Sequence, residues 1–274
     1  LQKKIKSELL IVSHLLKPPL KISDFKNDFY FSEFEKNKAF KKKKKFKILM
    51  NHTSHFKKGF RDKKKIILQN YTSFSSSIII FSKLFFQFLR FFILSFFSKK
   101  GSPANLRIIA LEFLSPKTFN NLIFKNNLKL LMKKAEIKKV FFTFEGFGWE
   151  RFLCEIIKKN DKDTKLIAYQ FAAILKQQNS MFQKIHPRYL PNIVLTVGKI
   201  NYRILKKKFS NVLILGSSRH FFGRKKFINN KYNKRINCLV LPEGIDTECK
   251  NLINFTMKCA KNNPKIKFIL RFHP

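Results

Sequence analysis

One carboxylate in this sequence stands where a catalytic group could act, in the stretch V-F-F-T-F-E-G-F-G-W-E-R. An apolar run stops at Glu145, which is followed by Gly146 and Gly148, and a helical pattern opens at once. In an open α/β sheet, ligands bind at the carboxyl ends of the strands. Burial among aromatic side chains raises the pKa of a carboxyl toward the range of a general base. The alternative is a structural glutamate that caps the helix or pairs with Arg151.

A second group that could do chemistry is His273, which precedes Pro274 at the end of an apolar run. A histidine at a strand end can donate a hydrogen bond to a phosphate oxygen. The same dipeptide occurs at His186-Pro187, where the surrounding pattern is irregular. A lone histidine is structural more often than functional, so position alone distinguishes His273.

Glycine is scarce, and five of the eight glycines follow predicted strands, at Gly146, Gly148, Gly198, Gly216 and Gly244. Glycine at such a point permits a tight turn and the close approach of backbone to a ligand. The sequence has neither a G-x-G-x-x-G fingerprint nor a Walker A pattern, so a dinucleotide site or a P-loop ATP site is not supported. We predict no metal site and no bound cofactor.

Short apolar runs alternate with helical patterns, which predicts an α/β fold with a parallel, doubly wound sheet. The expected strands are Glu8–Leu15, Lys65–Phe74, Leu106–Phe113, Val140–Phe144, Lys165–Gln170, Asn192–Val197 and Val212–Leu215. The expected helices run over 78–97, from Ser115-Pro116 to about Lys134, over Trp149–Lys159, and from Gly198 to about Lys208. A serine followed by proline is a helix-opening signal.

The domain organisation that we predict has three parts. Residues 1–219 form a first Rossmann-like domain, residues 220–235 form a basic linker, and residues 236–274 begin a second domain. The second part reads as one strand–helix–strand unit, which is too little sheet to stand alone. The sequence lacks an initial methionine and stops after an apolar run, so we expect a fragment whose second domain is truncated.

The most hydrophobic stretch is 78–97, and we predict an amphipathic helix over 78–98. Lys83, Gln87 and Arg90 follow the spacing i, i+4, i+7, which places them on one helical stripe. Three interpretations stay open: a helix packed on the domain, an in-plane contact with a membrane surface through 78–100, and a membrane span.

The composition is strongly basic, with 58 Lys and Arg against 16 Asp and Glu. The lysines are spread over nearly every segment, whereas a nucleic-acid-binding protein concentrates charge on one element. Lysine, asparagine, isoleucine and phenylalanine share AT-rich codons, so we attribute much of the bias to the genome and expect no nucleic-acid partner. Four cysteines without a C-x-x-C pair indicate reduced thiols and a cytoplasmic protein.

Several motifs together resemble the GT-B-type glycosyltransferases of bacterial surface-carbohydrate synthesis, over roughly 101–274. They are F-E-G-F-G-W-E-R-F, L-I-A-Y-Q-F-A-A, N-I-V-L-T-V-G, L-V-L-P-E-G-I-D-T-E-C and F-I-L-R-F-H-P. The likeness is closest to lipopolysaccharide and capsule transferases with an acidic-Gly motif and an HP motif. Sialyl-, polysialyl- and Kdo-transferases share that motif pair more loosely.

The resemblance implies two Rossmann-like domains that face each other across a cleft, with no metal. It makes Glu145 the base that deprotonates an acceptor hydroxyl, and His273 the group that stabilises the departing phosphate. Donor contacts are expected at Ser217, Ser218, Arg219, Pro242, Glu243 and Gly244, and acceptor or cleft contacts at Gly146, Trp149, Arg151 and Gln170. The substrates would be a nucleotide-sugar donor and a glycan or lipid-linked acceptor, handled at the inner face of the cytoplasmic membrane.

The sequence also departs from that family. Phe144 stands where the motif can carry a second carboxylate, and Phe171 stands where relatives often carry histidine after Y-Q. The Ser/Thr segment expected beyond the HP motif is absent because the sequence ends at Pro274. Two alternatives therefore remain, a GT-B-fold enzyme of other chemistry, such as a glycerophosphotransferase or a nucleotide-sugar epimerase, and a non-enzymatic basic protein that binds membrane or nucleic acid.

Overall fold

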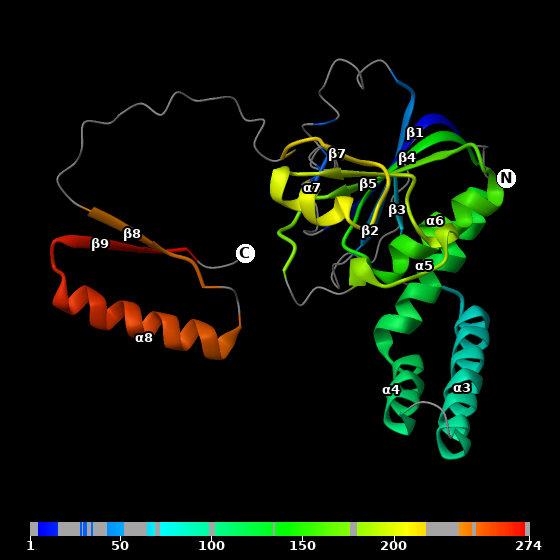
Figure 1. Cartoon of the computed structure of the whole chain (residues 1–274), viewed down its shortest axis with the longest axis horizontal. Helices are drawn as coiled ribbons and strands as arrows, with labels where there is room; N and C mark the ends of the chain where they lie inside the picture. The colour runs from blue at the N-terminus through cyan, green and yellow to red at the C-terminus, as the bar shows by residue number, and fades with distance from the viewer. Residues whose placement is uncertain are drawn as a thin grey trace. The chain divides into compact units, whose positions relative to one another are not determined.

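The computed structural model divides the chain into two compact units, Leu1–Phe221 and Phe222–Pro274 (Figure 1). The structure describes residues 5–15, 28, 30–31, 34, 43–51, 65–68, 72–98, 102–133, 135–175, 180–217, 236–242 and 245–271.

The first unit is built on a seven-stranded sheet in the order β3-β2-β1-β4-β5-β6-β7, in which every pairing is parallel. The strands are β1 (Ile5–Leu15), β2 (Lys45–Asn51), β3 (Lys65–Leu68), β4 (Ala135–Thr143), β5 (Lys165–Gln170), β6 (Ile193–Thr196) and β7 (Val212–Ile214). The predicted α/β class with a parallel, Rossmann-like sheet is confirmed. The strand order reverses between β1 and β4, which makes the space above these two strands the topological switch point.

The helices of this unit are α3 (Phe74–Phe97), α4 (Pro103–Phe113), α5 (Pro116–Met132), α6 (Gly148–Asn160) and α7 (Lys199–Lys206), with 3-10 turns η2 (Ser180–Phe182) and η3 (Pro187–Tyr189). Ser115 caps α5 as predicted, because its side chain accepts a hydrogen bond from the backbone N–H of Thr118. The helix predicted over 78–97 is also present, within α3.

Two local predictions were wrong. Leu106–Phe113 is not a strand but the body of α4, which begins with the same serine–proline signal, at Ser102 and Pro103. The strand predicted over Lys65–Phe74 ends at Leu68, and Phe74 instead opens α3 behind the capping residue Ser73. Strand β2 was not predicted at all, because its apolar residues follow directly on a run of lysines.

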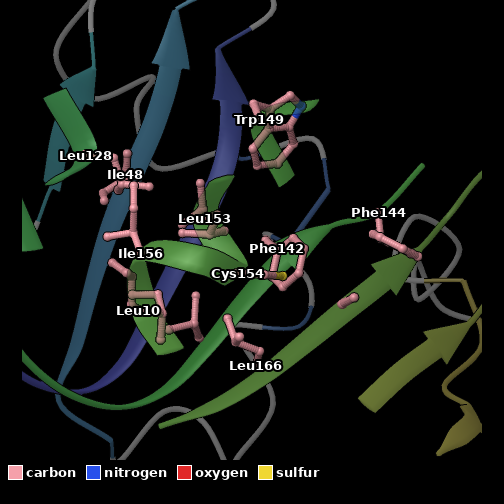
Figure 2. Close-up of a cluster of buried hydrophobic side chains, with 14 of the residues drawn as sticks. Leu10, Ile48, Leu128, Phe142, Phe144, Trp149, Leu153, Cys154, Ile156 and Leu166 are labelled. Carbon is pink, nitrogen blue, oxygen red and sulfur yellow. The ribbon is translucent and has the colours of Figure 1, made fainter. Parts of the chain in front are cut away.

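The main core lies between one face of the sheet and the helices α5, α6 and α7 (Figure 2). Alternate residues of β1 and β4, such as Leu10, Val12, Val140 and Phe142, point into it and are fully buried. The opposite face buries Leu9, Ile11, Phe31, Phe141, Ile167, Tyr169 and Leu195. Both faces of the central strands are therefore covered, as the continuous apolar runs of a parallel sheet require.

The helices α3 and α4 form a hairpin that stands away from the sheet (Figure 1). Its attachment is small: Ile80 and Leu84 of α3 pack against Ile123 of α5. Most of the remaining large apolar side chains of α3 are exposed. We call α3 and α4 the apolar hairpin below.

The second unit consists of β8 (Ile236–Val240), α8 (Asp246–Asn262) and β9 (Ile266–Leu270), with the two strands parallel. The predicted strand–helix–strand order is confirmed. The acidic residues Asp246 and Glu248 lie in the first turn of α8, where their negative charges stabilise the helix by interacting with the positive end of its dipole.

Candidate active site at the switch point

His14 lies at the carboxyl ends of the central strands β1 and β4, at the switch point. Its Nε2 atom lies 2.7 Å from Oγ1 of Thr143, the last residue of β4. Its ring meets Tyr30 and Trp149 edge-on, with centroid distances of 5.2 and 5.3 Å. His14 thus sits above the switch point, held by an aromatic ring from each side of the sheet. Sequence reasoning missed it because Thr143 lies 129 positions further along the chain.

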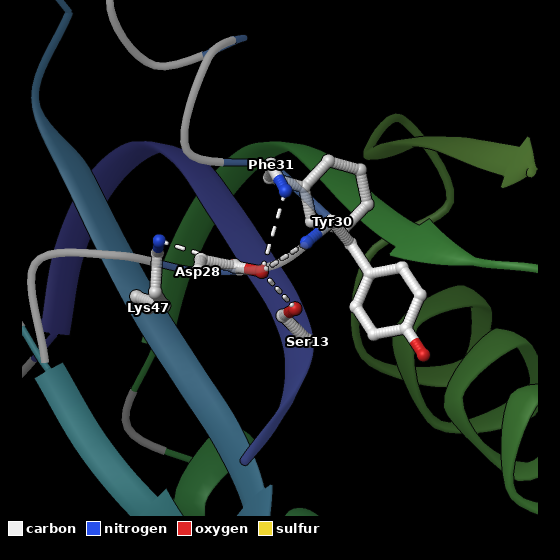
Figure 3. A network of polar contacts seen from close by, with 5 residues as sticks. All are labelled: Ser13, Asp28, Tyr30, Phe31 and Lys47. Atoms are coloured by element: carbon white, nitrogen blue, oxygen red, sulfur yellow. Dashed lines mark hydrogen bonds and ion pairs between the residues drawn. The ribbon is translucent and has the colours of Figure 1, made fainter. Parts of the chain in front are cut away.

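Tyr30 is positioned by a buried polar network around Asp28 (Figure 3). One carboxylate oxygen of Asp28 accepts hydrogen bonds from the hydroxyl of Ser13, at 2.7 Å, and from the backbone N–H of Tyr30, at 2.8 Å. The other oxygen accepts from Nζ of Lys47, at 3.2 Å. Asp28 therefore ties the segment after β1 to both β1 and β2, and this fixes Tyr30 beside His14.

The turn that carries Glu145 is held by a second glutamate, Glu150. The carboxylate of Glu150 accepts hydrogen bonds from the backbone N–H groups of Glu145, Gly146 and Phe147, at 2.7 to 3.1 Å. Burial raises the pKa of the Glu150 carboxyl above its ordinary value, and the three N–H donors oppose that shift by stabilising the carboxylate. The helix-capping role that the sequence offered as an alternative for Glu145 thus belongs to Glu150.

Gly146 is required at this turn for two reasons. Its φ of +84° is a conformation that L side chains rarely adopt, and an added Cβ would lie 2.7 Å from the backbone nitrogen of Met181. The hydroxyl of Ser180 also donates to the backbone carbonyl of Glu145, at 2.8 Å. The turn after β4 is therefore clamped against η2, and the half-buried Glu145 side chain extends from a fixed backbone.

The predicted cleft residues Arg151 and Gln170 both have partners inside the unit. The guanidinium of Arg151 donates to the backbone carbonyl of Ser180, at 2.7 Å, and to the side chain of Gln183, at 3.0 Å. Gln170 is fully buried, donates to the carbonyl of Ala172 and accepts from the side chain of Asn201. The contacts of Arg151 tie α6 to the loop after β5, and those of Gln170 tie the end of β5 to α7.

Trp149 is nearly buried and joins the edge to the core, because its ring also meets Phe124 and Phe142 edge-on. Among the expected donor contacts, Ser217 is half-buried beyond β7, and Pro242 is buried in the second unit. The others lie outside the described residues, as His273 does: they are Ser218, Arg219, Glu243 and Gly244.

Within the described ranges, no group of three or more His, Cys, Asp or Glu side chains could hold a metal ion. The cysteines in these ranges form no disulfide, and burial raises the pKa of the Cys154 thiol, which keeps it protonated. The described residues at the switch point include one carboxylate, Glu145, and one imidazole, His14, which can exchange protons beside aromatic rings.

Comparisons with known proteins found no match for this chain among protein-family models, curated proteins or solved structures.

Proposed function

We propose that this protein is a glycosyltransferase that uses a nucleotide-sugar donor, with Glu145 as the general base. The observation that carries the proposal is the position of Glu145, two residues beyond the end of β4 at the switch point, in a turn held by Glu150 and Gly146. A general base must be presented at a fixed position toward a ligand, and a strand end at a switch point is where open α/β sheets bind ligands.

In the proposed reaction, the Glu145 carboxylate takes the proton from an acceptor hydroxyl. The acceptor oxygen then attacks the anomeric carbon of the donor, a new C–O bond forms, and the bond from that carbon to the nucleotide phosphate breaks. The acceptor oxygen attacks from the side opposite the phosphate, which leaves with the electron pair, so this single displacement inverts the configuration at the anomeric carbon. The negative charge that develops on the phosphate calls for a donor group, which by resemblance is His273.

The acceptor would lie over His14 and the neighbouring aromatic residues, at the carboxyl ends of β1 and β4. Ligand sites combine apolar and aromatic walls with a few fixed polar groups, and this edge has that composition. The ring of Phe171 approaches Tyr30 with a centroid distance of 4.6 Å, which continues the aromatic surface beyond β5. The resemblance suggests a surface-polysaccharide or lipid-linked acceptor, reached from the cytoplasmic side of the membrane.

The proposal is tested by transfer of label from a panel of radiolabelled nucleotide sugars to a bacterial lipid and polysaccharide extract. We expect one donor class to give transfer, in the presence of EDTA as well as in its absence. Glu145→Gln should abolish transfer. Glu136→Gln is the matched control, because Glu136 lies near the opposite end of the same strand. Equal loss in both variants, or activity in neither the wild type nor the control with any donor, would count against the proposal.

A further inference from the structure

The apolar hairpin exposes more large hydrophobic side chains than a surface in water tolerates. Eleven residues of α3 are exposed by more than a third of their surface: Phe74, Ile78, Ile79, Phe81, Phe85, Phe86, Leu89, Ile93, Leu94, Phe96 and Phe97. On α4 and directly after it, Ile108, Ile109, Leu111 and Leu114 are exposed as well. Something must cover this surface in the cell.

The exposed residues of α3 lie mostly on one side of the helix. At 100° per residue, the residues from Phe81 through Leu89 to Phe97 cover an arc of roughly 160°, in which Ser75 and Ser82 are the polar residues. Lys83 and Arg90, seven positions apart, border this arc on one side. The helix has no acidic residue. An apolar arc flanked by cations is the pattern of helices that lie in a membrane interface, where long basic side chains reach the headgroups.

The connectivity argues for an in-plane arrangement rather than a span. By length and composition, α3 is the one helix in the described part of the chain that could cross a membrane. However, α3 follows β3, and α4 leads into α5, so the hairpin leaves and re-enters the same domain. With 11 residues, α4 has a length of about 16 Å, which is too short to cross back. Lys99 and Lys100 separate the two helices in the sequence, and charged residues between two apolar helices oppose deep insertion.

We infer that the apolar hairpin lies in the headgroup–acyl boundary of an anionic lipid bilayer, with the exposed arc of α3 toward the acyl chains. This inference does not depend on the proposed sugar transfer. A second copy of the chain fits the hairpin less well, because pairing would bring two rows of cations together on chains that each carry a net charge of +42. An anionic lipid surface complements that charge.

Vesicle flotation tests the inference. We expect the whole chain to float with vesicles that contain phosphatidylglycerol, and to bind pure phosphatidylcholine more weakly. Phe86→Ser with Ile93→Ser removes two residues of one stripe and should weaken binding at least about tenfold. The matched control is Phe255→Ser with Met257→Ser on α8, where the exposed fractions of 65% and 57% compare with 64% and 52% on α3. The control should bind like the wild type.

Two further variants sharpen the test. Lys83→Gln with Arg90→Gln should reduce affinity for anionic vesicles about 10- to 30-fold and lessen its dependence on salt. Phe86→Trp should add fluorescence that acyl-brominated lipid quenches, while the buried Trp149 stays unquenched.

Three results would overturn the inference. The wild type could remain at the bottom of the gradient with anionic vesicles, or the α8 control could lose as much binding as the α3 variant. In the third, sedimentation would show a dimer that Phe86→Ser with Ile93→Ser dissociates, without vesicle binding. That result would make the hairpin a contact between copies.

Discussion

Phenylalanine is treated in opposite ways in two regions of the first unit. In the sheet core, Phe142 and Phe144 are buried between strands and helices (Figure 2), and Phe124 of α5 is buried in the same cluster. On the apolar hairpin, Phe86 and Phe97 are exposed by 64% and 78% of their surface. Phenylalanine therefore stabilises the fold where it is buried in the sheet core. On the apolar hairpin it leaves an apolar surface that favours contact with an apolar partner.

This contrast shows why the residue counts of the sequence explain so little by themselves. The chain has 34 phenylalanines, and this count by itself does not distinguish buried from exposed positions. The structure separates those that build the fold from those that need a further surface. A substitution in the sheet body should therefore differ in its effect from a matched substitution elsewhere in the chain.

The largest difference in the free energy of unfolding is expected between the variants Phe142→Ala and Phe86→Ala. Phe142 is fully buried, and its truncation leaves a cavity that should lower the free energy of unfolding by about 3–5 kcal/mol. Phe86 loses little burial in water, so its truncation should change stability by less than about 0.5 kcal/mol. Urea unfolding measures both. Equal losses would show that the hairpin is packed in solution.

The second-largest loss of stability is expected when the buried ion pair between Asp28 and Lys47 is removed. Asp28→Ala leaves the buried ammonium group of Lys47 without its carboxylate, and should cost about 3 kcal/mol. Lys83→Ala on the exposed side of α3 is the counterpart and should be neutral in water. Thermal unfolding monitored by circular dichroism compares the two. A neutral Asp28→Ala would mean that the network around Ser13 does not hold the segment after β1.

Gly146→Ala should destabilise the protein by about 1–3 kcal/mol, because it forces a side chain into a positive φ and against the backbone of Met181. Gly198→Ala is the control, since an added Cβ there meets nothing within 4 Å and its φ of −174° is ordinary extended backbone. Denaturant midpoints of the two variants test this difference. If both are tolerated, the turn after β4 is not clamped.

The smallest effect is a dependence on pH. Burial opposes ionisation of Glu155, but its ion pairs with Lys159 and Lys125, both at 2.9 Å, outweigh this and lower its pKa below the ordinary 4.5. A lowered pKa in the folded state stabilises the protein above the ordinary value, and that stability is lost as pH falls through the folded pKa. Glu155→Gln should therefore lower the free energy of unfolding at neutral pH by less than about 1 kcal/mol, which is measured as a lower Tm. In strong acid the substitution should have no effect.

The control for this pH dependence is Glu112→Gln on the exposed α4, which should leave Tm unchanged. A loss from Glu155→Gln that persists undiminished in acid would show that packing, and not charge, is responsible.

Local signals made parts of this structure predictable. Strand β5 has the predicted bounds, and Ser115-Pro116 opens α5, because propensity and capping act over a few residues. The eight-residue apolar run that became α4 is too short for its periodicity to separate a helix from a strand. The position of Glu145 beyond β4 also followed from neighbouring residues.

The contact between His14 and Thr143 could not be predicted from the sequence, because it depends on the order of the strands in the sheet. His14 reaches Thr143 only because β1 and β4 are neighbours in the sheet, and no local pattern encodes that pairing. The role of Glu150 was hidden for a different reason. Which side chain accepts from the backbone N–H groups of the turn depends on the backbone conformation at Gly146, where φ is +84°, and the sequence does not show that conformation.

The central claim is that Glu145 removes a proton at the switch point. The most direct measurement compares kcat for nucleotide release, and Kd for the donor by calorimetry, between the wild type and Glu145→Gln, with circular dichroism to confirm folding. Loss of a general base predicts a kcat about 10²- to 10⁴-fold lower with donor Kd unchanged. A kcat within about twofold of the wild type would contradict the account.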